Sequence, residues 1–375
     1  MDIGKYIMKK SKELDIDIIG FTSCEPLHGL KGYLMERKNI GRETEFEERD
    51  MEKRMNPRAT LPGCKSIVVV GISYNSEFKP RPSRKPWGKL SRSSWGLDYH
   101  EVLWDRMERL IGAIQEKRGF NYKCFVDTGP LVDRELARNA GIGYYGKNCS
   151  IINPKYGSFI FIGYILTDLD IEVKPTVLEE ECGICTQCIK ACPTGALESP
   201  YGFNPMKCIS YLTQTKERIP YELRKHMGNS IYGCDICQNV CPKNRNIAMG
   251  NYKEFIPRDD KGYIDIEGIL SISNKDFNAK FGSMAGAWRG RNIWRRNAII
   301  ALGNTGDRAY LPMLKPFLKD PSPMLREYAI WAILNIDYGY GIGWIRDILE
   351  DEENEDIKSE AERIIAYFDT RNIQE

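Results

Sequence analysis

The sequence predicts an α+β protein of several domains, and three observations carry this prediction. Helical and strand-like patterns alternate through residues 1–175, which is typical of an α/β sheet domain. Eight of the twelve cysteines then fall between Cys182 and Cys241. The last part is helical and repeats a short apolar block at a spacing near 31 residues. We therefore divide the chain into segments 1–175, 176–245 and 246–375.

Length and composition exclude several classes of protein. With 375 residues, 42% of them hydrophobic, the chain can bury large cores. No run of about 18 apolar residues occurs, so we expect no membrane span. The first residues read as an amphipathic helix and a strand rather than a signal peptide, so we expect a cytoplasmic protein. The formal net charge of +2 says nothing about partners.

The first segment shows both periodicities of a sheet domain. Short apolar, β-branched runs read as buried strands, and apolar residues at helical spacing read as helices that a glycine ends. The expected strands are 66–71, 122–126 and 159–166, and the expected helices are 100–118 and 131–140, ending at Gly119 and Gly141.

Residues 79–92 interrupt this pattern with six basic residues, three prolines and no acid. Because proline lacks the backbone donor, we expect neither a helix nor a central strand here. One interpretation is a solvated loop, and the other is an arm that binds a phosphate-bearing ligand. The sequence leaves both open.

The helical segment contains a repeat. Residues 298–302 align with residues 329–333, and a fainter copy follows at 361–366. Small and aliphatic residues at this period predict stacked helix pairs of HEAT type. Two unrelated amphipathic helices are the alternative.

Charge divides the helical segment. Residues 280–326 have a net charge of +7, whereas residues 327–375 have a net charge of −9. In the basic part, arginines alternate with Trp288 and Trp294, a composition that suits phosphates and unstacked bases. A solvated helix face is the alternative. The candidate RNA contacts are Arg289, Arg291, Arg295 and Arg296.

The cysteine spacing predicts iron–sulfur clusters. Cys182, Cys185, Cys188 and Cys192, with Pro193 behind them, follow the run of bacterial two-cluster ferredoxins. In that run three thiolates reach one 4Fe–4S cube and the fourth reaches the other. A structural zinc site normally takes two Cys-x2-Cys pairs instead, so we favour iron–sulfur over zinc.

A second cysteine group completes the ligand count. Cys234, Cys237 and Cys241 lack one member of the run, and Cys208 can supply it. Crossing the fourth ligands then gives two full clusters, and segment 176–245 becomes a ferredoxin-like domain. The first cluster takes Cys182, Cys185, Cys188 and Cys241, and the second takes Cys192, Cys208, Cys234 and Cys237.

Four further cysteines lie singly in the first segment. Twelve cysteines in a long chain without an export signal favour metal binding or catalysis over a disulfide framework. We expect the single ones to be small buried hydrophobic residues. They are Cys24, Cys64, Cys124 and Cys149.

Adjacent clusters conduct electrons, so we expect the electron acceptor to bind in the first segment, residues 1–175. After the strand at 122–126, Gly129 and Pro130 lead into a helix with Asp133 in its first turn. Acids there commonly serve the helix dipole, which is one interpretation, and a catalytic carboxyl is the other. The glycine-rich stretch 141–148 follows a helix and precedes a strand, so it is no dinucleotide fingerprint. It reads as a loop that approaches a ligand closely.

These motifs resemble those of the epoxyqueuosine reductase family, over essentially the whole chain. The family often has Trp where this chain has Tyr144 or Tyr145. The matching pieces are 56–58 with 61–63, 95–100, 127–134 with 140–148, both cysteine groups and the helical repeats.

The resemblance implies an oxidoreductase that reduces epoxyqueuosine to queuosine at the first anticodon position of transfer RNA. It implies two 4Fe–4S clusters that feed cobalamin with its lower base detached, no protein ligand on cobalt, and Asp133 as the general acid. We expect a monomer, an external low-potential electron donor, and a tRNA anticodon stem-loop held by the repeats. The residues expected at cobalamin are Arg58, Trp95, Asp98, His100, Asp133, Lys147, Asn148, Ser150 and Ser210.

Two other classes stay open. Reductive dehalogenases combine the same cofactors, but they usually carry a twin-arginine export signal and lack a basic helical tail. The non-enzymatic alternative is an electron-transfer ferredoxin that docks through its repeats. Such a ferredoxin would contain no corrinoid.

Overall fold

The computed structural model describes every residue except 1, 77–85, 174–176, 258–261 and 373–375. The chain forms two compact units. Unit 1 takes 1–77, 96–206 and 235–256, and unit 2 takes 78–95, 207–234 and 257–375. The predicted divisions at 175 and 245 therefore do not separate these units, because the chain passes from one to the other several times.

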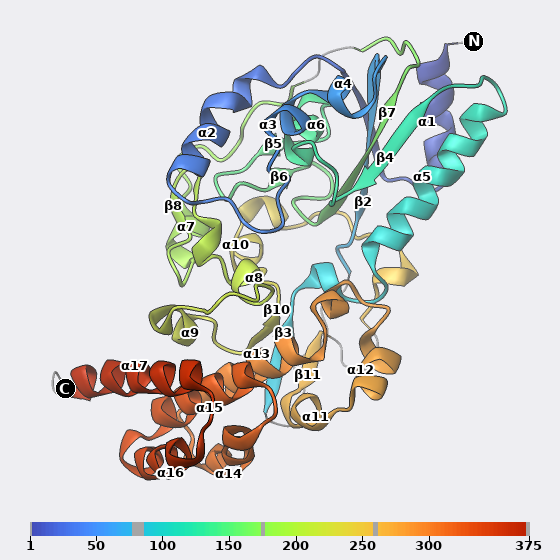
Figure 1. Cartoon of the computed structure of the whole chain (residues 1–375). Coiled ribbons are helices and arrows are strands. Elements are labelled where there is room, and N and C mark those ends of the chain that lie inside the picture. The colour runs from blue at the N-terminus through green and yellow to red at the C-terminus, as the bar shows by residue number, and fades with distance from the viewer. Residues whose placement is uncertain (1, 77–85, 174–176, 258–261, 373–375) are drawn as a thin grey trace. The chain divides into compact units, whose positions relative to one another are not determined.

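Unit 1 is built on a four-stranded antiparallel sheet (Figure 1). Its strand order is β1 (Ile18–Ser23), β2 (Ser66–Ser73), β7 (Ile160–Thr167) and β4 (Tyr122–Val126). Every residue of β2 is buried, as its apolar, β-branched sequence predicts. The three strands expected in this segment are therefore confirmed, to within two residues at each end.

Helices cover both faces of this sheet. Val68, Val70 and Ile72 of β2 face α1 (Ile3–Glu13) and α5 (Tyr99–Gln115) in one core. The alternate residues Ile67 and Val69 face the opposite core, because successive side chains of a strand point to opposite faces. That second core includes residues of α2 (Lys31–Asn39), α3 (Met51–Met55) and α6 (Asp133–Asn139), with α4 (Pro57–Thr60) beside α3 (Figure 1).

Helix α5 ends earlier than expected. Its last residue is Gln115 and Glu116 is the cap, so the prediction that the helix runs to Arg118 with Gly119 as its cap is wrong. The amides of Lys117 and Arg118 both bond to the carbonyl of Ile114, which closes the last turn without a glycine.

The rest of unit 1 consists of short elements that carry most of the cysteines. Two small hairpins each pair two antiparallel strands. The helices α7 and α10 pack against each other. The bounds are β5 Tyr144–Tyr145, β6 Ile151–Ile152, α7 Gln187–Ala191, β8 Leu197–Ser199, β9 Gly202–Phe203 and α10 Ile236–Asn239.

Two of the single cysteines are bonded to each other. Both are buried as predicted, but the structure joins Cys24 and Cys64 in a disulfide, so the expectation of metal binding or catalysis rather than disulfides is wrong for this pair. Strands β1 and β2 end on the pair Ser23 and Ser66, which brings the adjoining cysteines together. Cys124 is buried as predicted, whereas Cys149 is only partly buried.

Unit 2 contains a three-stranded sheet with β3 (Trp87–Leu90) in its centre. β10 (Ser230–Tyr232) pairs with β3 in parallel and β11 (Tyr263–Asp265) pairs antiparallel. The prediction that 79–92 contains no central strand is therefore wrong. All three prolines precede β3, so its backbone donors are intact. Residues 79–85 of that basic segment lie outside the described residues.

The helices of unit 2 end in a stack. α13 (Arg291–Gly303) packs on α15 (Pro323–Ile336), which packs on α17 (Glu355–Asn372). Ala298, Ala329 and Ala361, which head the repeated blocks, are all buried. The predicted HEAT-type stack is confirmed (Figure 1). The other helices are α8 Ile209–Leu212, α9 Tyr221–His226, α11 Ile266–Ser271, α12 Asn274–Phe281, α14 Leu311–Leu314 and α16 Tyr338–Asp351.

A search of the described helices for one that is long and apolar enough to cross a membrane finds none.

Candidate active site and cluster pocket

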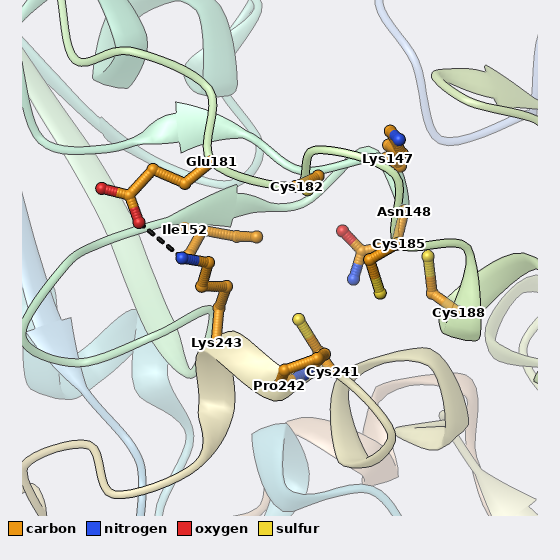
Figure 2. Close-up of a pocket in the computed structure, with 10 residues that line it drawn as sticks. All are labelled: Lys147, Asn148, Ile152, Glu181, Cys182, Cys185, Cys188, Cys241, Pro242 and Lys243. Carbon is orange, nitrogen blue, oxygen red and sulfur yellow. Dashed lines mark hydrogen bonds and ion pairs between the residues drawn. The ribbon is translucent and has the colours of Figure 1, made fainter.

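Four cysteines of unit 1 line one pocket, shown in Figure 2. They are Cys182, Cys185, Cys188 and Cys241, the ligands predicted for the first cluster. The first three lie before and within α7, and Cys241 follows α10, so the packing of α7 on α10 brings the distant cysteine to the others. The other lining residues are Lys147, Asn148, Ile152, Glu181, Pro242 and Lys243.

The pocket suits a polyatomic group better than a single ion. It is lined by four cysteines and is partly open to solvent. Among the described residues, no three His, Cys, Asp or Glu side chains gather closely enough to hold one metal ion. Burial raises the pKa of the Cys182 thiol to about 11. Ligation would therefore release protons from this pocket, because thiolates are the metal ligands.

The ligands predicted for the second cluster divide between the two units. Cys192 and Cys237 belong to unit 1, whereas Cys208 and Cys234 belong to unit 2. All four are partly exposed. The assignment of these four to one cluster stays a prediction.

Asp133 begins α6 but does not cap it. The cap position is Val132, whose side chain makes no capping hydrogen bond. Burial, and next the negative charge of Asp127, raise the pKa of the Asp133 carboxyl well above its usual 3.8. An acid placed to serve the helix dipole would be held as an anion with a lowered pKa. The raised pKa of Asp133 is the opposite of what the helix-dipole interpretation predicts, and the catalytic interpretation stays a prediction.

Asp127, for which the sequence predicted no role, is held as an anion beside this carboxyl. Tyr99 donates a hydrogen bond to its Oδ2 at 2.9 Å, and His100 Nε2 lies 3.7 Å from the same oxygen. Burial alone would raise the pKa of Asp127, but the pairing with His100 and the bond from Tyr99 outweigh it and lower the pKa. Its φ of 56° is a left-handed conformation that aspartate tolerates. The sequence could have indicated a role for Asp127 only through its position just before the Asp133 motif.

His100 sits between two carboxylates. Its Nδ1 lies 2.7 Å from Asp98 Oδ1, and Asp127 faces its other nitrogen. Burial alone would lower the pKa of His100, but Asp127 and Asp98 outweigh it and raise it to about 9. Because the folded-state pKa is raised, these pairings stabilise the fold below pH 6.5, and that stabilisation is lost as the pH rises through about 9. The imidazole is therefore cationic at neutral pH.

The other residues expected at cobalamin are dispersed. Arg58 forms an exposed ion pair with Glu25 at 2.9 Å. Lys147 and Asn148 line the cluster pocket, and the amide of Ser150 donates to Asn148 Oδ1. Ser210 lies in α8 of unit 2, where its carbonyl accepts bonds from Thr213 and Gln214.

Trp95 is a packing residue of unit 2. Only 3% of it is exposed, and its indole donates to the carbonyl of Leu90. A Cβ at Gly262 would lie 2.5 Å from the indole ring, so backbone and ring pack closely there. This burial disagrees with the predicted role of Trp95 in binding a cofactor.

The predicted arginine surface is largely committed to the fold of unit 2. Arg296 is 0% exposed and donates to the carbonyls of Leu212 and Thr215, so the prediction that it contacts RNA is wrong. Arg295 pairs with Asp320 at 2.8 Å. The sequence does not show whether an arginine of a helix is buried or exposed, because packing decides which face of the helix is buried.

The remaining arginines are more accessible. Arg291 donates to the carbonyl of Ile272 and is partly exposed. The Arg289 guanidinium lies 4.1 Å from the centre of the Trp288 ring, and Trp288 is 55% exposed. The part of the predicted surface that faces solvent is therefore centred on this aromatic–cation pair.

Three family models match the chain, one within each of the three segments predicted from sequence. Residues 54–128 match "Epoxyqueuosine reductase QueG, DUF1730". Residues 181–244 match "4Fe-4S double cluster binding domain" and residues 292–366 match "HEAT repeats".

Curated relatives and solved structures extend the match to nearly the whole chain. The epoxyqueuosine reductase of Bacillus cereus is 42% identical over 95% of each chain, and that of Bacillus subtilis is 40% identical over 96% of this chain and 95% of the relative. An epoxyqueuosine reductase solved with an epoxyqueuosine-modified tRNA-Tyr stem loop superposes with a TM-score of 0.93 at 38% identity, over 98% of this chain and 99% of the other. The chain belongs to the epoxyqueuosine reductase family, and it is an oxidoreductase with a 4Fe–4S double cluster domain.

Proposed function

We propose that this chain reduces epoxyqueuosine to queuosine in the anticodon loop of transfer RNA, with electrons delivered by two 4Fe–4S clusters to base-off cobalamin. The observation that carries the proposal is the place of Asp133 at the start of α6 beside Asp127, where burial and then the negative charge of Asp127 raise the pKa of the Asp133 carboxyl. Family membership supports it, since a relative has been solved with an epoxyqueuosine-modified stem loop. An external low-potential donor supplies the electrons, and the protein acts as a monomer.

The residues around Asp133 fit a corrinoid cofactor. When bound, cobalamin would supply low-potential reduction of the epoxide carbon. His100 is paired with Asp98 and faces Asp127, and a cationic imidazole cannot ligate cobalt, which fits a base-off corrinoid without a protein ligand. The amide side chains of a corrin need polar partners. Arg134, the residue after Asp133, is exposed and donates to the carbonyl of Cys149, which leaves other donors of its guanidinium for such an amide.

Asp133 supplies the proton that the reaction requires. Conversion of the epoxide to an alkene consumes two electrons and two protons and releases the oxygen as water. Opening the epoxide leaves an alkoxide, so a proton donor must lie within hydrogen-bonding reach of that oxygen. Burial, and next the charge of Asp127, raise the pKa of Asp133 and so favour its protonated form, because a second negative charge beside the first is unfavourable. A catalytic aspartate loop is also described for a Bacillus subtilis relative.

The reaction is tested on a stem-loop that carries epoxyqueuosine. We expect the protein, loaded with iron, sulfide and cobalamin and given a chemical reductant, to lower the mass of the RNA by one oxygen atom. Protein without corrinoid is the control and should leave the mass unchanged. An unchanged RNA mass with fully loaded protein would reject the proposed function, and reduction without corrinoid would reject the cobalamin part alone.

The accessible part of the basic surface should contact the RNA. Trp288→Ala with Arg289→Ala should weaken stem-loop binding by about 1–3 kcal/mol per unstacked base. The salt dependence of binding should flatten by a slope of roughly 0.7–0.9 for each phosphate that the variant no longer neutralises. Arg363→Ala, an exposed arginine in the acidic half of the repeats, is the matched control. If both variants bind the stem-loop with equal affinity and equal salt dependence, Trp288 and Arg289 do not belong to the RNA-binding surface.

A further inference from the structure

A buried amide without a partner lies in the cluster pocket. Asn148 is 7% exposed and lines the pocket beside the cysteines. Its Nδ2 is buried and has no hydrogen-bond partner within the protein. In Figure 2 the amide reaches into the space among Cys185, Cys188 and Cys241. A buried donor left unpaired is costly, so this nitrogen calls for an acceptor inside the pocket.

The orientation of the Asn148 amide is set by its neighbours. Its Oδ1 accepts the backbone N–H of Ser150 at 3.2 Å, which assigns the oxygen and leaves the NH2 group to face the pocket. Gly146 allows this placement, because a Cβ there would lie 2.7 Å from Asn148 Oδ1. The amide is thus a fixed donor and not a freely turning side chain.

A second buried donor packs beside two of these cysteines, Cys182 and Cys241. Tyr144 is 3% exposed, and its hydroxyl is buried without a partner. It packs in one cluster with Ile152, Cys241 and Cys182. Tyr144 belongs to β5, and Asn148 lies in the turn between β5 and β6, so one hairpin presents both donors.

The cations of the pocket are already occupied. Lys147 Nζ donates to the carbonyl of Gly183, and Lys243 Nζ pairs with Glu181 at 2.6 Å. Each ammonium thus has an acceptor, whereas the buried donors without any partner, Asn148 Nδ2 and the Tyr144 hydroxyl, are neutral. Neutral donors suit a cluster whose sulfurs carry negative charge that grows on reduction.

We propose that Asn148 and Tyr144 donate hydrogen bonds to the sulfurs of the first cluster and raise its reduction potential. This inference rests on the first cluster of the proposed function and assigns two positioning residues to it. The reduced cluster carries one more negative charge than the oxidised cluster, so donors aimed at its sulfurs stabilise the reduced form more. Asn148 thereby serves the cluster and not the corrin, where its sequence position had suggested a role.

The test is a redox titration of the first cluster, followed by its electron paramagnetic resonance signal. Asn148→Leu keeps the approximate size and removes the donor, and Tyr144→Phe removes only the hydroxyl. For each we expect a roughly tenfold fall in the ratio of reduced to oxidised cluster at a fixed potential, which equals 59 mV for one electron. Asn121→Leu, whose amide pairs with Asp168 at the edge of unit 1, should leave the potential unchanged.

Cluster content separates this role from a merely structural one. Iron content and the signal of the second cluster should stay normal in Tyr144→Phe, so that variant remains decisive even if Asn148→Leu assembles poorly. An unshifted potential in a fully loaded Tyr144→Phe and Asn148→Leu would overturn the inference. If the potential of the first cluster shifts in the variants but the unaltered, fully loaded protein does not reduce the stem-loop, the proposed function is rejected and the inference stands.

Discussion

Asp133→Asn should fold, retain both clusters and bind the stem-loop, yet reduce epoxyqueuosine about 100- to 10,000-fold more slowly, the usual span for loss of a general acid. Asparagine keeps the shape of the side chain but holds no acidic proton. The measurement is single-turnover reduction followed by RNA mass, since a single turnover excludes effects on product release. Asp168→Asn, which alters an exposed carboxylate that bonds to Asn121, is the matched control and should react at the normal rate.

The same variant distinguishes the two interpretations of this acid by its stability. Because burial raises the folded-state pKa of Asp133, the stability linked to its protonation is present at low pH and lost as the pH rises. Removing the carboxyl should therefore leave the protein at least as stable at neutral pH. An acid serving the helix dipole would instead cost about 0.3–1 kcal/mol when removed. Near-normal reduction together with lowered stability would return Asp133 to that structural role.

Cys241→Ser should abolish the first cluster while the second keeps its signal, although Cys241 lies far along the chain from its partners. The reason is the packing of α7 on α10, which places Cys241 in the pocket of Cys182, Cys185 and Cys188. Iron content should fall by roughly half, because one of two four-iron cubes is lost. Turnover should stop, because the chain of electron carriers is broken.

Cys192→Ser is the reciprocal experiment. The crossed assignment predicts loss of the second cluster, with Cys208, Cys234 and Cys237 as its other ligands, and survival of the first. Spectroscopy of the two variants should show complementary losses. Loss of the first cluster in Cys192→Ser, with its signal intact in Cys241→Ser, would show that each run of cysteines keeps its own fourth ligand.

Local sequence determined a large part of this protein. The strand predicted at 66–71 is observed as β2, with every residue buried, because apolar, β-branched runs report local conformation and burial together. The cysteine run identifies the iron–sulfur domain because ligand spacing is a matter of short-range reach. The alanine blocks at 298 and 329 reveal the helical stack because each repeat packs only on its neighbours.

Residues whose role depends on a distant partner were decided by the tertiary structure alone. Cys24 and Cys64 form a disulfide because two strand ends meet across the register of β1 and β2. Arg296 reads as a surface charge in the sequence, but its side of α13 turns inward onto the carbonyls of Leu212 and Thr215. Segment 87–90 becomes a central strand only because β10 and β11 arrive on either side of it.

The candidate site shows the same division. Asp133 was found from its motif. Its raised pKa, however, follows from burial and from Asp127, and the sequence shows neither that burial nor the pairing of Asp127 with His100. Asn148 was assigned to the corrin by its place in a glycine-rich loop, and its unpaired amide became visible only inside the pocket. Spacing along a chain fixes what a few neighbouring residues can reach, whereas desolvation and hydrogen bonding depend on every group that packing brings near.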